Sequence, residues 1–494
     1  MKKGKVELWF ITGSQHLYGE ETLKQVEADS RAIAGALDSS GMIATRVIFK
    51  PVLTTADAIT SVCLEANSSS DCAGLITWMH TFSPAKMWIS GLKRLQKPLL
   101  HFHTQFNRDI PWSEIDMDFM NLNQSAHGDR EFGFICSRLG MERKVVVGHW
   151  QDNEALQAIG NWSRAAVGSL EARSLRVARF GDNMRDVAVT EGDKVSAQLY
   201  LDFEVHGYGV GDLADVVGRV SDMQVSALLE QYGDEYFAPS KILASKAVRE
   251  AARIEAGMRT FLEEGGFRAF TTNFEDLHGL VQLPGMAVQR LMADGYGFGA
   301  EGDWKTAALV RIMKVMAEGL EGGTSFMEDY TYHLDPHDMS VLGAHMLEVC
   351  PSIASGKPAL EVHPLGIGGR DDPARLVFKA RTGRAIAASM IGMGDRFRLI
   401  VNNLEVVECP PMPLLPVASV LWKPEPDLRT ATAAWIYAGG AHHTGFSQSL
   451  TAEHMAEYAA ITGTEFILID QKCDIELLRK ELRWNDLYYR MKPA

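Results

Sequence analysis

The chain has 494 residues, of which 46% are hydrophobic and 23% charged, so it is long enough for two or three globular domains with a large buried core. Its formal net charge of -14 argues against nucleic acid or an acidic membrane surface as a partner, because both normally require clustered Lys and Arg. A neutral or cationic small molecule fits this charge better.

The cysteines and the first residues bear on the cellular compartment. Six widely spaced cysteines include no CxxC pair and no compact framework, which predicts reduced thiols. The basic start "MKKGKVELWFITG" differs from a signal peptide, because Glu7 interrupts its short apolar stretch and no small-residue cleavage site follows. No apolar run approaches the length of a membrane span. We expect a soluble, cytoplasmic protein.

The first two thirds of the chain alternate short apolar runs with amphipathic stretches, beginning with "VELWFITG" and then "EETLKQVEADSRAIAGAL". This pattern is typical of a parallel sheet wound with helices. A second alternating block starts at "SLRVARFGDNM" and contains the long helical segment "SKAVREAARIEAGMRTFLEEGG". The pattern predicts a doubly wound N-terminal α/β domain over residues 1–175 and a doubly wound central α/β domain over residues 176–320.

Beyond Gly322 the pattern changes to β-rich runs without helices between them, such as "ARLVFKARTGRAIAASMIG" and "DRFRLIVNNLEVVEC". A helix, "TAEHMAEYAAITG", a strand, "EFILID", and a last helix close the chain. The third predicted domain is therefore β-rich and covers residues 321–494.

Two segments carry candidate carboxylates. In "GAEGDWKTAAL", Glu301 and Asp303 stand beside glycines just before a helical stretch, where capping of that helix is the simpler interpretation. In "GGTSFMEDYTYH", Glu328 and Asp329 stand among aromatic residues, and a carboxylate in such a setting needs a partner or a metal. Taken alone, this segment supports a site and an ordinary surface equally well.

Two further segments carry candidate histidines. His345 lies in "SVLGAHMLEVCPS", which predicts a largely buried strand, and a buried imidazole is most often hydrogen-bonded to backbone. In "YAGGAHHTGFS", an extended conformation would point His442 and His443 to opposite sides, so we expect only one of them to serve a given site. Two glutamates with two histidines offer four N/O ligands without thiolate, which favours Mn²⁺ or a related ion over structural zinc.

A polar loop follows the first predicted strand, where wound sheets commonly bind ligands. Its sequence, "ITGSQHLYG", lacks the GK[ST] ending of a nucleotide loop, and its groups suit hydroxyls better than phosphate. These groups belong to Ser14, Gln15, His16 and Tyr18.

The chain resembles the L-arabinose isomerase family along essentially its whole length. The stretches that carry the resemblance include "GSQHLYGEETL", "HTFSPAKMWI", "IDMDFMNLNQSAHG", "RFGDNMR", "TTNFEDLHGL", "AEGDWKTA", "GGTSFMEDYTYH", "LGIGGRDDPARL" and "GGAHHT". The resemblance implies a cytoplasmic, Mn²⁺-dependent enzyme that interconverts L-arabinose and L-ribulose, with D-galactose to D-tagatose as a side reaction. It also implies a homohexamer of three-domain subunits with active sites at subunit interfaces.

The resemblance further implies a role for individual residues. The metal ligands, for one Mn²⁺ per subunit, fall on Glu301, Glu328, His345 and His443, and the two glutamates also move the protons. His442 would support the metal site or pack beside it. The implied substrate contacts are Gln15, Leu17, Met184, Phe274 and Tyr330, with His127 reaching in from a neighbouring subunit.

Two alternatives stay open at this point. One is a non-enzymatic sugar-binding protein, because wound sheets also form ligand-binding clefts. The other is a related aldose isomerase that prefers D-galactose or L-fucose, because a binding pocket separates such similar sugars by only small differences in free energy. Our hypothesis is a cis-enediol path with Glu301 and Glu328 as the acid/base pair, and the competing chemistry is a metal-assisted hydride shift.

Overall fold

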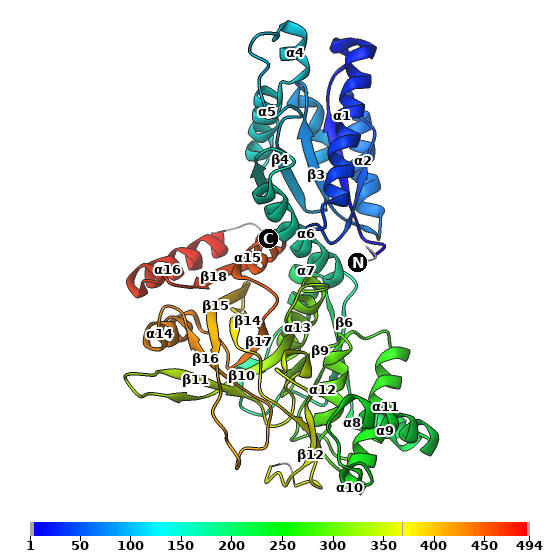
Figure 1. Cartoon of the computed structure of the whole chain (residues 1–494), viewed down its shortest axis with the longest axis vertical. Coiled ribbons are helices and arrows are strands. Elements are labelled where there is room, and N and C mark those ends of the chain that lie inside the picture. Colours follow the sequence, from blue (N-terminus) through cyan, green and yellow to red (C-terminus); the bar gives the residue numbers. More distant parts are fainter. Residues whose placement is uncertain (1–3, 368, 492–494) are drawn as a thin grey trace. The chain divides into compact units, whose positions relative to one another are not determined.

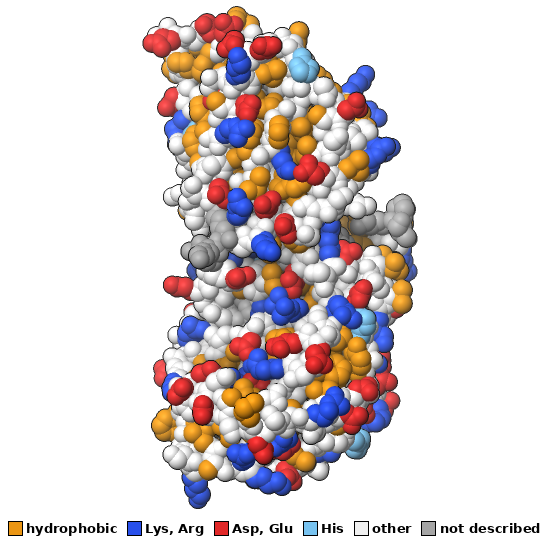
Figure 2. All heavy atoms as spheres, turned by 90° about the vertical axis from the view of Figure 1, so that its right-hand side faces the viewer, with side chains coloured by type: hydrophobic (Ala, Val, Ile, Leu, Met, Phe, Trp, Pro, Cys, Tyr) orange, Lys and Arg blue, Asp and Glu red, His pale blue; other side chains and the backbone are white. Residues whose placement is uncertain are grey.

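The computed structural model describes residues 4–367 and 369–491, which form two compact units (Figure 1). One unit consists of Met1–Leu170 and Ala456–Ile461, and the other consists of Glu171–Met455 and Thr462–Ala494. Acidic and basic side chains are interspersed over the face drawn in Figure 2. Within the described residues, no helix is both long and apolar enough to cross a membrane.

The first unit is a doubly wound parallel sheet with the strand order β2-β1-β3-β4-β5. Its core strand β3 is wholly buried, as expected for an apolar run covered on both faces. Helices α1 and α6 cover one face of the sheet, and α2 and α5 cover the other. The strands are β1 (Glu7–Gly13), β2 (Arg46–Phe49), β3 (Cys72–Met79), β4 (Leu99–His103) and β5 (Lys144–Val147). The helices are η1 (His16–Tyr18), α1 (Gly19–Ser39), α2 (Ala56–Ser68), η2 (Ala85–Trp88), α3 (Ile89–Leu92), α4 (Met117–Leu122), α5 (Ser125–Arg138) and α6 (Asn153–Ala172).

The second unit begins with a four-stranded parallel sheet in the order β7-β6-β8-β9. Apolar residues of α8, α11 and α12 form one core with this sheet, while α13 packs along β9 and β8. The strands are β6 (Arg176–Phe180), β7 (Glu204–Tyr208), β8 (Ala269–Thr272) and β9 (Gly297–Ala300). The helices are η3 (Ala188–Thr190), α7 (Lys194–Leu201), α8 (Val210–Gly218), α9 (Asp222–Glu235), α10 (Ser240–Leu243), α11 (Lys246–Glu264), α12 (Gly285–Ala293) and α13 (Trp304–Met316).

The rest of this unit is a β-barrel in the order β14-β17-β10-β11-β16-β15, closed because β14 also pairs with β15. Strand β18 adds to β15 in parallel, and β12 and β13 form a separate pair. The strands are β10 (Thr324–His333), β11 (Ser340–Ala344), β12 (Ala359–Val362), β13 (Ala374–Val377), β14 (Gly383–Gly392), β15 (Phe397–Val407), β16 (Ser419–Pro424), β17 (His443–Ser447) and β18 (Glu465–Ile469). The helices are η4 (Pro351–Ile353), α14 (Leu428–Ala438) and α16 (Ile475–Met491). Helix α15 (Ala452–Thr462) begins in this unit, and its residues Ala456–Ile461 belong to the first unit.

Strand β10 joins the two cores of the second unit. Met327 belongs to the core that contains the barrel residues Trp422 and Phe446, whereas its neighbour Phe326 packs with the central sheet. Because side chains alternate along a strand, Glu328 points to the same side as Phe326, toward the central sheet and α13. The predicted fold class, two wound α/β parts followed by a β-rich part, is confirmed. Helix α14 within the β-rich part was not predicted.

Candidate active site

Strand pairing brings a glutamate and two histidines together. Strand β10 lies between β11 and β17, and its Glu328 is in register with Ala344 on one side and His443 on the other. His345 follows Ala344 directly, and its Nε2 lies 3.8 Å from an Oε atom of Glu328. Phe326 packs edge-on against both imidazoles, at centroid distances of 5.1 and 5.2 Å. Phe326 therefore provides an apolar surface against which the imidazoles of the site pack.

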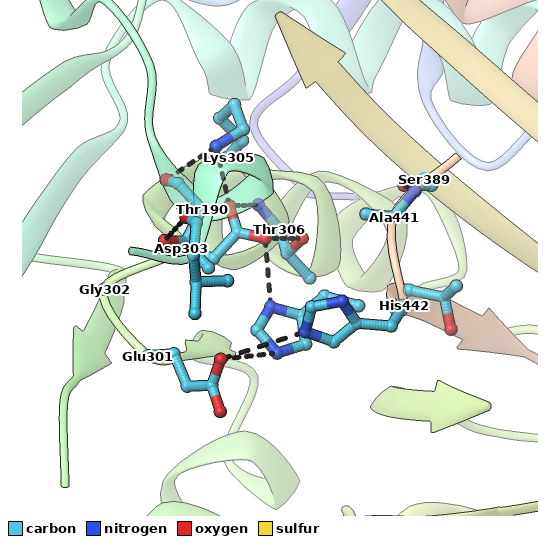
Figure 3. Close-up of polar contacts among 12 residues, drawn as sticks. Thr190, Glu301, Gly302, Asp303, Lys305, Thr306, Ser389, Ala441 and His442 are labelled. Atoms are coloured by element: carbon cyan, nitrogen blue, oxygen red, sulfur yellow. Dashed lines mark hydrogen bonds and ion pairs between the residues drawn. The ribbon is translucent and has the colours of Figure 1, made fainter. Parts of the chain in front are cut away.

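The second glutamate comes from the turn between β9 and α13. Glu301 has φ 59°, a left-handed conformation that costs a non-glycine residue roughly 1–2 kcal/mol. Its Oε2 lies 3.8 Å from Nε2 of His442 and 3.8 Å from Nε2 of His443 (Figure 3). The turn thus directs this carboxylate at the paired histidines.

His442 and His443 do not point to opposite sides, as an extended chain would place them, and the expectation that only one of them serves the site stays a prediction. Strand β17 begins at His443, so His442 lies before the strand and the alternation of an extended chain does not apply to it. The two rings stand 4.3 Å apart, and both approach Glu301. The expected strand around His345 also ends earlier, at Ala344.

A carboxylate holds the far nitrogen of each buried imidazole. Nδ1 of His443 donates to Asp303 at 3.2 Å, and Nδ1 of His345 donates to Glu348 at 2.5 Å. Such a bond fixes the tautomer that leaves Nε2 with a free lone pair, as in metal-binding histidines. Nε2 of His443 is buried and has no hydrogen-bond partner among the described residues. A buried imidazole nitrogen without a hydrogen-bond partner is expected where the imidazole can bind a further ligand.

Acidic and basic groups at the site shift one another's pKa values. Burial opposes ionisation of Asp303, but Lys305 and His443 hold the pKa of this carboxyl well below its usual range. Burial likewise opposes ionisation of Glu301, yet the imidazoles of His442 and His443 lower its pKa below the ordinary value. The pKa of His345 is raised although burial alone would lower it, because Glu348 and other acids surround it. The carboxylates and the positively charged groups thus favour one another's charged forms.

The residues that could hold a metal fall into two adjoining groups. The ligand atoms of Glu301, His442 and His443 lie within 4.8 Å of one another, and Glu328 with His345 forms the neighbouring pair. All four ligands implied by the family resemblance are therefore brought together, with His442 as an additional candidate. We favour His443 over His442, because only His443 has both a fixed tautomer and an unpaired buried nitrogen.

Two supporting residues were not assigned to the site from the sequence. Asp303 was interpreted as a helix cap, and it does accept a hydrogen bond from Thr306 N at 3.3 Å, but it also holds His443. Glu348 was not singled out. The i,i+3 spacing of His345 and Glu348 is the signal that could have identified it.

The implied substrate residues divide between the two units. In the second unit, the Met184 amide donates to the carbonyl of Glu301 at 3.0 Å, and Phe274 is half-buried after β8. Tyr330 lies two residues beyond Glu328 on β10 and is 53% exposed. The other three belong to the first unit: Gln15 donates to Phe82 O, Leu17 is exposed, and His127 is exposed on the first turn of α5.

Comparison with known protein families matches three consecutive parts of the chain. Residues 2–174 match the L-arabinose isomerase N-terminal domain, residues 176–319 the L-arabinose isomerase central domain, and residues 323–465 the L-arabinose isomerase C-terminal domain. A solved structure described as an ABC sugar transporter (periplasmic sugar binding protein) from Legionella pneumophila covers 64% of this chain and 95% of its own. It is 12% identical with a TM-score of 0.15, too low to support an argument on fold.

Curated relatives match over nearly the full length. An L-arabinose isomerase from Herpetosiphon aurantiacus is 63% identical and the match covers 98% of both chains. One from Koribacter versatilis is 61% identical over 99% of this chain and 98% of its own, and one from Geobacillus thermodenitrificans is 59% identical over 98% of both. The chain belongs to the L-arabinose isomerase family.

Proposed function

We propose that the protein interconverts L-arabinose and L-ribulose, and that it needs one divalent ion, Mn²⁺, held by Glu301, Glu328, His345 and His443. The observation that carries this proposal is the pair of glutamates facing two imidazoles whose far nitrogens are fixed by buried carboxylates. A sugar-binding protein has no need of this arrangement, because neutral hydroxyls are bound by ordinary hydrogen bonds.

The residues fit a metal of this kind. Two carboxylates and two imidazoles, none of them a thiolate, suit Mn²⁺ and its relatives. The unpaired, buried Nε2 of His443 is difficult to account for without a further ligand, because burying a polar atom without a partner costs free energy. When bound, such an ion would stabilise the negative charge that develops on the sugar oxygens O1 and O2 during reaction.

The protein's own groups account for the proton transfers. Moving the carbonyl from C1 to C2 requires removal of the C2 proton, delivery of a proton to C1, and transfer of a proton between O1 and O2. Glu301, whose pKa lies below its ordinary value, begins as a carboxylate able to accept a proton. Glu328, which lies beside His345 and is in register with His443, supplies the second carboxyl. The sugar then passes through a cis-enediol.

Ketose formation tests this function. The protein is stripped with chelator and resupplied with Mn²⁺, and L-arabinose, D-galactose and L-fucose are offered separately. We expect metal-restored conversion that is fastest with L-arabinose, and loss of conversion in Glu328→Gln at an unchanged melting midpoint. Faster conversion of another sugar would reassign the substrate, and sugar binding without any conversion would favour the binding-protein alternative.

The other properties implied by the resemblance are also proposals. They are a cytoplasmic location, a homohexamer with active sites at subunit interfaces, and conversion of D-galactose to D-tagatose as a side reaction. Supporting the shared sites, Leu17 is 81% exposed and His127 is exposed, which leaves both available to a neighbouring subunit. A hexamer mass by light scattering is expected, and a monomer mass with full activity would contradict the shared sites.

A further inference from the structure

The turn that carries Glu301 is strained. Glu301 has φ 59° and Gly302 has φ 82°, and the other two non-glycine residues with positive φ in the described chain are both aspartates. Aspartate tolerates this conformation better than glutamate, because its short side chain can hydrogen-bond locally. A strained turn of this kind persists only where surrounding groups hold it.

A neighbouring segment, residues 181–192, holds this turn through Asn183 and Met184. The Asn183 side-chain amide donates to the carbonyl of Gly302 at 3.1 Å and to the carbonyl of Thr190 at 2.5 Å. The backbone N–H of Met184 donates to the carbonyl of Glu301 at 3.0 Å. Asn183 is only 6% exposed, so water has little access to replace these bonds.

The two segments are also in direct backbone contact. A Cβ added to Gly302 would lie 2.6 Å from the Cα of Asn183, so only glycine permits this approach. Lys305 adds a second tie, because its Nζ donates to the carbonyls of Thr190 and Glu191 at 2.9 and 2.8 Å and lies 3.1 Å from Asp303 (Figure 3). The turn and the segment are therefore held together by hydrogen bonds and by close backbone packing.

We propose that Asn183 is a positioning residue for the isomerisation: its amide clamps segment 181–192 to the Glu301–Gly302 turn and thereby aims the Glu301 carboxylate. Asn183 acts through the backbone, since both of its donor bonds go to carbonyl oxygens. The inference rests on the proposed role of Glu301. It also links Glu301 to Met184, so one amide sets the position of two residues of the proposed site.

Two substitutions separate positioning from folding. Asn183→Asp keeps the shape and the oxygen that accepts from Arg179, but it places an oxygen against the carbonyls of Gly302 and Thr190. Asn183→Ala removes the amide altogether. The matched control is Glu191→Ala in the same segment, because that side chain is exposed and only the backbone carbonyl of Glu191 contacts Lys305.

The measurements are kcat and KM for L-arabinose, Mn²⁺ binding from the loss of the free-ion EPR signal, and the melting midpoint. We expect both Asn183 variants to lower kcat by about 10- to 100-fold, the effect of a misplaced reacting group, with a smaller change in KM. Mn²⁺ binding should weaken as well, and Glu191→Ala should match the wild type. A structural role alone would lower the midpoint and leave kcat per folded site unchanged.

Three outcomes have different meanings. Wild-type kcat and Mn²⁺ affinity in the folded Asn183 variants would overturn this inference. No ketose from the wild type itself would instead overturn the proposed function. If neither Asn183 variant folds, Arg179→Gln replaces them as the test, because the Arg179 guanidinium donates to the Asn183 side-chain oxygen and so orients the amide from outside the turn. This variant should also lower kcat. An unchanged kcat in Arg179→Gln would overturn the inference.

Discussion

Removing the Glu348 carboxylate should weaken metal binding while the barrel stays folded. Glu348 is 7% exposed, and its Oε2 accepts from Nδ1 of His345 at 2.5 Å and from Leu347 N at 3.1 Å. A hydrogen bond to a charged group contributes about 1.5–3 kcal/mol. Since each 1.4 kcal/mol is tenfold, Glu348→Ala should weaken Mn²⁺ binding roughly 10- to 150-fold. Glu348→Gln keeps an acceptor for His345 and should lose about half of that free energy.

Mn²⁺ titration of the chelator-stripped variants, followed by the free-ion EPR signal, measures this effect. The matched control is Glu361→Ala, which removes another carboxylate–histidine pair, Glu361 with His363 at 2.5 Å, neither of them a proposed metal ligand. The control should bind Mn²⁺ as the wild type does. Wild-type affinity in a folded Glu348→Ala protein, or an equal loss in Glu361→Ala, would refute the argument that Glu348 orients His345.

Three further predictions concern stability and thiol chemistry. Gly343→Ala would place a Cβ 1.9 Å from the Trp422 side chain in the barrel interior. Calorimetry should show that this variant is less stable than the wild type by about 1–3 kcal/mol or more. Gly356→Ala is the control, because the space around Gly356 is open, and its stability should not fall. Burial raises the pKa of three thiols to about 11, and burial with nearby acids also raises the pKa of the Cys473 thiol. Because Cys473 is half-buried and the other five cysteines are buried, a thiol reagent at pH 8 should modify Cys473 first, and Cys473→Ser should abolish that fast phase. Between pH 9 and 11 the unfolded chain releases protons that the folded chain holds, so the unfolding free energy should fall as the pH rises, by up to about 1 kcal/mol per thiol per pH unit in the middle of this range; a flat profile would contradict this. The three thiols are Cys63, Cys72 and Cys136.

The two wound sheets are predictable from sequence because their signals are local. Strand β3 is one continuous apolar run, and α11 is one amphipathic stretch, so each appears within a short window. The barrel is different. Its closure depends on β14 pairing with β15, and its site depends on β10 pairing with β17, more than 100 residues away in the chain. Hydrophobic periodicity does not indicate which distant strands pair with each other.

The site could be anticipated in part. Residue types alone indicated two glutamates and two histidines, and the family resemblance selected Glu301, Glu328, His345 and His443. The hydrophobic pattern could not show that the strand begins at His443. His442 therefore lies before the strand, and its ring also approaches Glu301. Nor could it show that the helix cap Asp303 also orients an imidazole, because that contact spans 140 positions.

Solvent deuterium incorporation tests the central claim most directly, namely that carboxylates move a proton between C1 and C2 through a cis-enediol. The Mn²⁺-loaded protein converts L-arabinose to ketose in D₂O, and NMR measures deuterium at C1 of the product. The account predicts deuterium at C1, with both conversion and incorporation lost in Glu301→Gln and Glu328→Gln. Complete retention of the original hydrogen at C1 would contradict it and indicate a hydride shift.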